Sequence, residues 1–428
     1  METIYQVQTV NNIKPIEVQV PGSKSITNRA LMLAALSNGP CLLKGVLFSD
    51  DSRAVLKCLQ DLGFQVEINE EIKEVLIYGL AGNIPNRNAE INVQSAGTAA
   101  RFLTVMLAFA GGNYRLNSSE QMKKRPMEPL LSVLKSIGVT IRFLEKEGHF
   151  PFELESKSLS PEEIHINTDI SSQFASALLM SAVLLKDGLT LVMEGSRTEG
   201  SYIKITLEMM KQFGIPFTKE DNVCHVAYNN QFSLATYVIE PDLSGACYFY
   251  AMAPLLKTKV TVKNVHAHSL QGDIQFLSVL ETLGCTLHHL PEGIMVDGTI
   301  DSYPGITLSM KDFSDQTMTM AVVAAFATSK TCIQNVSHIR FQESNRMEAI
   351  CNELHKLGIR CEIGNDFEDI TIYPGPMGPA VIETYEDHRM AMAFALVGLK
   401  VEGVEIKNPG CCSKTFENYF ELLEEVTK

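Results

Sequence analysis

The stretch LQDLGFQV, residues 59–66, carries the pattern that decides the fold, because the chain repeats it at intervals of 70 to 76 residues. The other copies are LKSIGVTI (134–141), MKQFGIPF (210–217), LETLGCTL (280–287) and LHKLGIRC (354–361). In each copy two apolar residues stand three apart, a glycine follows, and apolar positions then alternate. A glycine in the left-handed region closes a helix, and alternation with a period of two predicts a strand. Each copy is therefore predicted to end a helix and to lead into a strand.

A second series of segments, rich in Ala, Met and Leu, interleaves with the first. These segments begin near Ser25, Thr98, Ser171, Ser244, Gln316 and His388. They are apolar nearly all round, which is typical of a helix buried on every side. Helices such as 50–63 and 342–358 carry a polar face instead and should be exposed. One repeat is thus a buried helix, a strand, an exposed helix and two more strands, and six such repeats fit the chain.

Six helix-centred repeats divide most naturally into two domains of three. Proline and glycine signals at 20–22 and 240–242 predict the two crossings between the domains. We expect one discontinuous domain of residues 1–21 with 241–428, and one inserted domain of residues 22–240. The first strand then belongs with the second half of the chain.

Composition excludes several classes of protein. The 50 acidic and 36 basic residues give a net charge of −14, which disfavours nucleic-acid binding but allows a locally positive pocket. The chain has no P-loop, no GxGxxG after a strand and no GxSxG. Its ten cysteines form no CxxC pair, so we expect reduced thiols in the core and no metal. The longest apolar run, 174–185, is too short for a membrane span. The start lacks signal-peptide features, which predicts a cytoplasmic protein.

Most of the unusual polar residues stand at the starts of the buried helices. These starts are SKSITNR (23–29), QSAGT (94–98), DISSQ (169–173), SDQ (314–316) and EDHR (386–389). An N-cap explains any single case. It does not explain the cations, because a cation opposes the dipole at a helix N-terminus unless an anion lies between them. With the carboxylates Asp315, Glu343 and Asp387 nearby, the set suits proton transfer on a phosphorylated or carboxylated substrate.

Eight motifs together resemble one family. They are PGSKSITNRALMLAAL, SAGTAARF, KKRP, SSQFASALLM, SDQTMT, QESNR, EDHRMAMAF and CCSKTF, in this order along almost the whole chain. In these motifs the chain resembles the 5-enolpyruvylshikimate-3-phosphate synthases. The resemblance implies a two-domain enolpyruvyl transferase fold of class α/β, an inside-out α/β barrel with six βαβαββ repeats, and a site in the cleft between the domains.

The resemblance also implies an activity. A transferase of this family moves the enolpyruvyl group of phosphoenolpyruvate to the 5-hydroxyl of shikimate-3-phosphate and releases phosphate. The reaction belongs to the shikimate pathway, which leads to chorismate and the aromatic amino acids. We therefore expect a monomer with small-molecule substrates, no cofactor, and no nucleic-acid or membrane partner.

Residue roles follow from the resemblance position by position. Asp315 matches the residue that takes the proton of the 5-hydroxyl, and Glu343 matches the glutamate that moves the methylene proton; Lys24 and His388 complete the implied catalytic set. The implied shikimate-3-phosphate contacts are Lys24, Ser25, Arg29, Ser171, Ser172, Gln173, Asp315, Arg197, Tyr202 and Gln342. The implied phosphoenolpyruvate contacts are Lys24, Gly97, Arg125, Gln173, Arg346, Arg389 and Lys414.

The chain departs from the family pattern at three places. Gln342 stands where the family usually has Lys, so we expect Arg340 or Arg197 to supply the missing charge. Ser95 stands where Asn is frequent. Residues 195–202 align ambiguously, so Arg197, Ser201 and Tyr202 all remain candidates for contacting shikimate-3-phosphate.

Two alternative functions stay open. The first is the sister transferase that acts on UDP-N-acetylglucosamine, although Lys24 is followed by Ser25 rather than by Asn, and no Cys lies between Cys58 and Cys224. The second is an inactive paralogue that only binds anions, which Gln342 alone favours.

Overall fold

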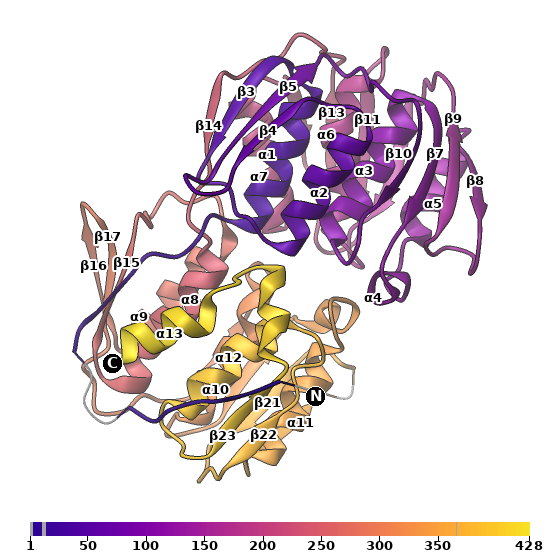
Figure 1. The fold of residues 1–428 in the computed structure, drawn as a ribbon. Coiled ribbons are helices and arrows are strands. Elements are labelled where there is room, and N and C mark those ends of the chain that lie inside the picture. The colour runs from indigo at the N-terminus through magenta and orange to yellow at the C-terminus, as the bar shows by residue number, and fades with distance from the viewer. Residues whose placement is uncertain (1–2, 11–13, 365) are drawn as a thin grey trace. The chain divides into compact units, whose positions relative to one another are not determined.

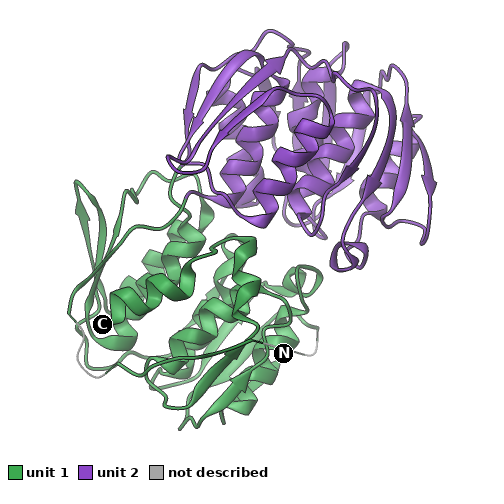
Figure 2. Ribbon diagram, in the orientation of Figure 1, with its two compact units in different colours: residues 1–21, 240–428 green, residues 22–239 purple. Residues whose placement is uncertain are grey.

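The computed structural model describes residues 3–10, 14–364 and 366–428 of the chain. Their contacts divide the chain into two compact units (Figure 2). Unit 1 comprises Met1–Pro21 with Glu240–Lys428, and unit 2 comprises Gly22–Ile239. Each unit has its own helices and sheets, so each is described by itself.

The segments that are apolar all round form buried helices, as predicted. They are α1 (Lys24–Leu36), α3 (Gly97–Ala110), α6 (Ser172–Ser181), α8 (Leu243–Leu256), α10 (Thr317–Ala325) and α12 (His388–Gly398). In α1 every residue from Ile26 to Leu36 is buried, and in α10 every residue is buried. Within unit 1, α8, α10 and α12 contact one another, and within unit 2 α3 contacts both α1 and α6. The buried helices therefore form the centre of each unit (Figure 1).

The predicted amphipathic helices pack around these centres. They are α2 (Asp50–Asp61), α5 (Glu128–Ser136), α7 (Ser201–Gln212), α9 (Gln275–Thr282) and α11 (Arg346–Lys356). The structure adds α13 (Tyr419–Thr427) and a short α4 (Glu120–Lys123), which the repeated pattern did not mark. The glycine that closes each repeated pattern has a positive φ, for example 89° at Gly63 and 100° at Gly138. A strand follows each of these glycines, which confirms the prediction of a helix, a left-handed glycine and a strand.

The sheets of unit 2 share one topology. Their orders are β14 (Thr236–Val238), β3 (Asn38–Lys44), β5 (Glu74–Leu80), β4 (Val66–Asn69); β6 (Asn88–Asn92), β7 (Gly112–Asn117), β9 (Phe152–Ser156), β8 (Thr140–Phe143); and β10 (Glu163–Asn167), β11 (Leu189–Glu194), β13 (Val223–Val226), β12 (Phe217–Glu220). In each sheet the first pair is parallel and the other pairs are antiparallel. Strand β14 comes from the end of the unit and completes the sheet of its first repeat.

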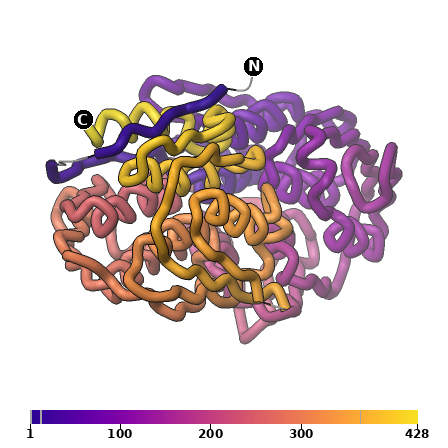
Figure 3. The backbone as a smooth tube through the Cα atoms, turned by 90° about the horizontal axis from the view of Figure 1, so that it is seen from below, coloured from indigo at the N-terminus to yellow at the C-terminus, as the bar shows by residue number. Residues whose placement is uncertain are grey.

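Unit 1 repeats this plan with two strands from the start of the chain. Its sheet orders are β2 (Ile16–Val18), β15 (Lys259–Lys263), β17 (Gly293–Asp297), β16 (Thr286–Leu290); β18 (Thr307–Ser309), β19 (Thr331–Gln334), β21 (Ile370–Tyr373), β20 (Arg360–Ile363); and β1 (Ile4–Gln6), β23 (Val404–Lys407), β22 (Ala380–Ile382). Strand β2 pairs with β15 in parallel, and β1 pairs with β23 antiparallel. The indigo start of the chain accordingly runs beside its yellow end in Figure 3.

One expectation from the sequence is wrong. The cysteines were expected to be reduced thiols, but a disulfide joins Cys351 on α11 to Cys361 on β20. The glycine turn at 358 folds the strand back along its helix, so two cysteines ten residues apart meet. The other described cysteines are free. Among the described helices, none combines the length and the apolar character that crossing a bilayer would take.

Candidate active site

In unit 2 the N-terminus of α1 brings Lys24 to a carboxylate. Lys24 Nζ lies 3.4 Å from Asp51 Oδ2, and the Asp51 side chain is only 4% exposed. No side chain caps α1 at Ser23, so capping does not explain the polar residues there. Asp51 was not predicted. The acidic pair Asp50–Asp51 directly after Ser49, at the start of an amphipathic helix, was the available signal.

Arg29, on the first turns of α1, is buried, with only 1% of its surface exposed. It donates hydrogen bonds to Thr206 Oγ1 (2.8 Å) and to the backbone oxygens of Ser25 (2.9 Å) and Tyr202 (3.2 Å). Burial lowers the pKa of Arg29 to about 10. Arg29 therefore ties the start of α1 to the start of α7, and its predicted contact with substrate stays a prediction.

Gly97 and Arg125, both predicted phosphoenolpyruvate contacts, meet at the start of α3. A Cβ added to Gly97 would lie 2.6 Å from Arg125 Nη1 and 2.9 Å from Arg101 Nη1. Only glycine lets the guanidinium of Arg125 approach the helix start so closely. Arg101 itself donates to the Gly97 carbonyl oxygen (3.1 Å). Two arginines thus gather at a helix N-terminus, where an anion would also be attracted.

The start of α6 matches the capping interpretation. Ser171 Oγ accepts from the backbone N–H of Gln173 at 3.3 Å, and Ser172 follows as the first helical residue. The amide oxygen of Gln173 is buried and accepts no hydrogen bond from the described residues. Of the three candidates in 195–202, Tyr202 is linked to the site through Arg29, whose guanidinium carbon lies 5.9 Å from its ring. Arg197 and Ser201 are half-buried in and just after the same loop.

In unit 1 Arg346 stands at the centre of an ionic network. Its side chain is 1% exposed and contacts the three predicted carboxylates. Arg346 Nε donates to Asp387 Oδ2 (2.8 Å), Nη1 to Asp315 Oδ1 (3.1 Å) and Nη2 to Glu343 Oε2 (2.9 Å). Burial opposes the charged form, but Asp387, Glu343 and Asp315 outweigh it and hold the pKa of Arg346 above its ordinary value.

The other predicted cations of unit 1 complete this network. Arg389 Nη2 donates to Asp315 Oδ2 at 2.8 Å, and Lys414 Nζ lies 3.8 Å from Glu343 Oε1. Asp387 caps α12 by accepting from the backbone N–H of Arg389 at 3.0 Å. His388 is buried beside it, with Nδ1 3.9 Å from Asp387 Oδ1. The anions that balance these cations are therefore the chain's own carboxylates.

Gln342 takes part in the network as an acceptor. Its side-chain oxygen accepts a hydrogen bond from Arg346 Nη1. Arg340, expected as one source of the missing charge, bonds to the Ser337 carbonyl oxygen (3.0 Å) and stacks at 4.7 Å on Phe367. In this structure the guanidinium of Arg340 is thus engaged with its own loop and with an aromatic ring.

Two buried acids beneath the network were missed. Asp242 caps α8 by accepting from the Ser244 backbone N–H (3.1 Å), and Ser244 Oγ donates to Asp273. Burial, and next the charge of Asp315, raise the pKa of Asp273 to about 7, although Arg389 opposes the shift. For Asp242 the available signal was the start of the fourth buried helix, PDLSG (241–245), where an acid stands at the N-cap position.

Both units therefore hold cations at the starts of buried helices, and unit 1 adds carboxylates that accept hydrogen bonds from the same cations. Arginine binds phosphate and carboxylate groups through paired hydrogen bonds. Such groups on a ligand compete with Asp315 and Glu343 for the same guanidinium nitrogens. The arrangement can bind anions and can place an acid or base next to them. No cluster of His, Cys, Asp and Glu suited to a metal ion occurs in residues 3–10, 14–364 and 366–428.

Comparison with known proteins shows similarity to EPSP synthases along nearly the whole chain. The sequence model of the family described as EPSP synthase (3-phosphoshikimate 1-carboxyvinyltransferase) matches residues 8–423. The 3-phosphoshikimate 1-carboxyvinyltransferase of Nostoc sp. is 40% identical over 422 residues, which is 98% of each chain. That of Aeromonas salmonicida is 37% identical over 416 residues, or 96% of each chain.

The solved structures agree in fold. EPSP synthase from Acinetobacter baumannii matches with a TM-score of 0.82 at 21% identity, covering 100% of this chain and 98% of that one. At this identity the likeness concerns the fold, which confirms the predicted two-domain α/β class. Since the family model and the relatives both match from nearly one end to the other, the chain belongs to the EPSP synthase family.

Proposed function

We propose that this chain transfers the enolpyruvyl group of phosphoenolpyruvate to the 5-hydroxyl of shikimate-3-phosphate and releases phosphate. The name shared by its relatives supports this activity. The observation in the chain itself that carries it is the position of Asp315, which is buried and held between Arg346 and Arg389. This arrangement puts a base directly beside two groups that bind anions.

The chemistry follows from that competition for the arginines. When the carboxylate and phosphate of phosphoenolpyruvate bind Arg346 and Arg389, those guanidinium groups no longer neutralise Asp315. Asp315 then accepts the proton of the 5-hydroxyl group, while the oxygen of that hydroxyl forms a bond to the central carbon of phosphoenolpyruvate. The methylene carbon gains a proton in this addition and loses one again when the bond to phosphate breaks, and Glu343 serves that transfer. A positioned acid or base typically contributes about 10²–10⁴-fold in rate.

We propose further that the polar helix starts of the two units act on the same pair of substrates. Lys24, Gly97 with Arg125, and Ser171 to Gln173 would supply the contacts from unit 2. The proposal is supported by the presence of family motifs in both units of the chain. Substitutions in either unit should then raise the Michaelis constant for the same substrate.

The test is a coupled assay of phosphate release with shikimate-3-phosphate and phosphoenolpyruvate. We expect steady turnover, and no turnover when UDP-N-acetylglucosamine replaces shikimate-3-phosphate. Turnover with UDP-N-acetylglucosamine alone would favour the sister transferase. Binding of both substrates to folded protein without phosphate release would favour the inactive paralogue. The cytoplasmic location and the monomeric state stay predictions, which cell fractionation and light scattering would test.

A further inference from the structure

A cavity of about 490 Å³ lies in unit 2 at the C-terminal end of α3. Three cations line it, Arg87, Lys157 and Lys186, and no carboxylate does. None of the three forms an ion pair with a carboxylate of the described chain. In a protein with a net charge of −14, a cavity lined only by positive charge stands out from its surroundings.

Backbone contacts place two of the three cations beside one turn. The turn is Gly111–Gly112, between α3 and β7. The carbonyl oxygen of Arg87 accepts from the Asn113 N–H at 2.8 Å, directly after the turn. A Cβ added to Gly111 would lie 3.6 Å from the Lys157 carbonyl oxygen. The backbone at Arg87 and the backbone at Lys157 therefore both pass beside this glycine pair.

Lys186 lines the same cavity and lies two residues after the 3-10 turn η1 (Ala182–Leu184), which follows α6. This turn lies against the first repeat, since a Cβ on Gly82 would come within 2.5 Å of Leu184 Cδ2. The cavity is thus built by segments of three successive repeats. The buried Phe109 and Tyr228, which is 42% exposed, also line it.

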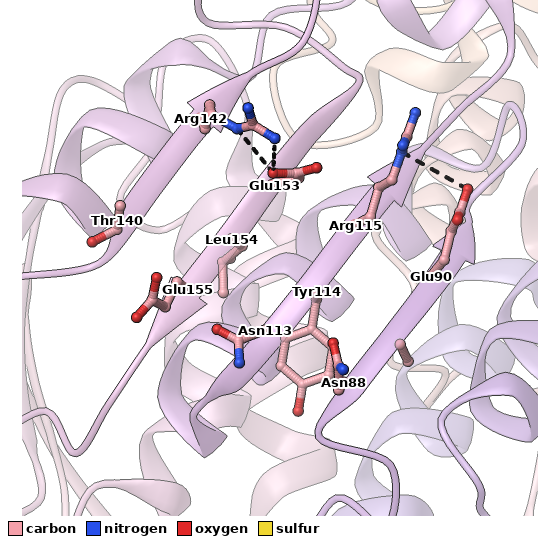
Figure 4. A pocket seen from close by; sticks show the side chains of 11 residues that line it. Asn88, Glu90, Asn113, Tyr114, Arg115, Thr140, Arg142, Glu153, Leu154 and Glu155 are labelled. Atoms are coloured by element: carbon pink, nitrogen blue, oxygen red, sulfur yellow. Dashed lines mark hydrogen bonds and ion pairs between the residues drawn. The ribbon is translucent and has the colours of Figure 1, made fainter.

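A second cavity in unit 2 serves as a contrast. It measures about 520 Å³ and lies over the outer face of the sheet formed by β6, β7, β9 and β8 (Figure 4). Its arginines are already neutralised, because Arg142 Nε donates to Glu153 (2.9 Å) and Arg115 Nε lies 3.9 Å from Glu90. A phosphate there would have to displace a carboxylate. The cavity at the Gly111–Gly112 turn imposes no such competition.

Stabilisation of the negative end of α3 explains a cation near this turn, but not three cations that line one cavity together with two aromatic residues. The cavity is also separate from the candidate active site. That site gathers at the N-terminus of α3, and a helix of 14 residues spans about 20 Å. The volume falls in the range of about 300–1,000 Å³ that is typical of small-molecule sites.

We propose that this cavity is a second binding site, for the phosphoryl group of a small metabolite. Arg87, Lys157 and Lys186 hold the phosphate, and Phe109 with Tyr228 receives the apolar part of the ligand. The site is independent of the reaction proposed above, so an inactive protein would bind the same ligand. It offers a place where a phosphorylated metabolite stabilises unit 2 without occupying the active site.

Calorimetric titration of the full chain with AMP tests the proposal, with inorganic phosphate as a second probe. The variant carries Arg87→Gln, Lys157→Gln and Lys186→Gln. The control carries Lys57→Gln, Lys135→Gln and Lys211→Gln, which remove the same charge from exposed positions of unit 2. We expect the dissociation constant of AMP to rise tenfold or more in the cavity variant and to stay unchanged in the control. Weaker binding of inorganic phosphate would assign the site to a phosphate ester, and equal binding would assign it to free phosphate.

Acetylation of lysines in the wild-type protein gives a readout that needs no variant. AMP should protect Lys157 and Lys186 from an amine-reactive reagent, as measured by mass spectrometry, and should leave Lys57 and Lys211 as reactive as before. Equal loss of affinity in both triple variants would overturn the proposal, since only general charge would then matter. Absence of protection at both cavity lysines, or a wild-type dissociation constant above about 5 mM, would overturn it as well.

Discussion

Replacing Asp273 by Asn should change how the stability of the protein depends on pH. The carboxyl of Asp273 is 6% exposed and accepts a hydrogen bond from Ser244 Oγ. Burial is the largest cause that raises its pKa from 3.8 to about 7, and the charge of Asp315 adds to it. In the native state this side chain is therefore mostly protonated at pH 5 and mostly ionised at pH 8.

The sign follows from proton linkage. Between about pH 4 and pH 7 the native state holds a proton on Asp273 that the unfolded chain has already lost. Stability then falls as pH rises through that window, and the contribution is gone above the native pKa. With the two pKa values 3.8 and about 7, the loss between pH 5 and pH 8 is on the order of 2–3 kcal/mol. Asn keeps the shape and an acceptor for Ser244 but cannot ionise.

The assay is urea unfolding of the wild type and of Asp273→Asn at pH 5 and at pH 8, at constant ionic strength. Between pH 5 and pH 8 we expect the free energy of unfolding of the wild type to fall by about 2–3 kcal/mol more than that of the variant. Asp301→Asn, at an exposed position of unit 1, is the matched control and should follow the wild type. Parallel changes in the wild type and in Asp273→Asn would refute the argument, because Asp273 would then ionise alike in both states.

Three further predictions concern the candidate active site. Asp315→Asn should lower turnover by about 10²–10⁴-fold with an unchanged thermal melt, and near-normal turnover would exclude its role as base. Gly97→Ala should displace the guanidinium of Arg125, 2.6 Å from the new Cβ; losing one charge-assisted hydrogen bond of about 1.5–3 kcal/mol should raise the Michaelis constant for phosphoenolpyruvate tenfold or more, and an unchanged value would contradict this. Gln342→Lys should bring little gain for shikimate-3-phosphate, because the new ammonium faces Arg346 where an acceptor stood. A tenfold lower Michaelis constant would show instead that Gln342 merely weakens the binding of shikimate-3-phosphate.

Much of the site could be listed from the sequence, because polar residues at the starts of apolar helices break a local pattern. Arg389 and Asp315 were predicted in this way, and the structure brings them to 2.8 Å. Asp273 gave no such signal, since an acid in QGDI (271–274) looks like a solvated turn. Arg340 was one of two arginines expected to compensate for Gln342, and in this structure its guanidinium stacks on Phe367. Which way a long side chain turns depends on neighbours that are distant in the sequence.

The sequence by itself determined the repeated helices, their glycine ends and the strands that follow. These features depend on hydrogen bonds between residues that are close in the sequence and on the spacing of apolar side chains. Both can be recognised in a stretch of about ten residues. Only the tertiary structure decided that Arg29 lies buried against Thr206, that Asp273 loses its water, and that Cys351 meets Cys361. It also decided that Arg87, Lys157 and Lys186 surround one cavity. Burial and charge pairing depend on groups that are distant in the sequence and that folding brings together. A short stretch of the chain therefore does not reveal them.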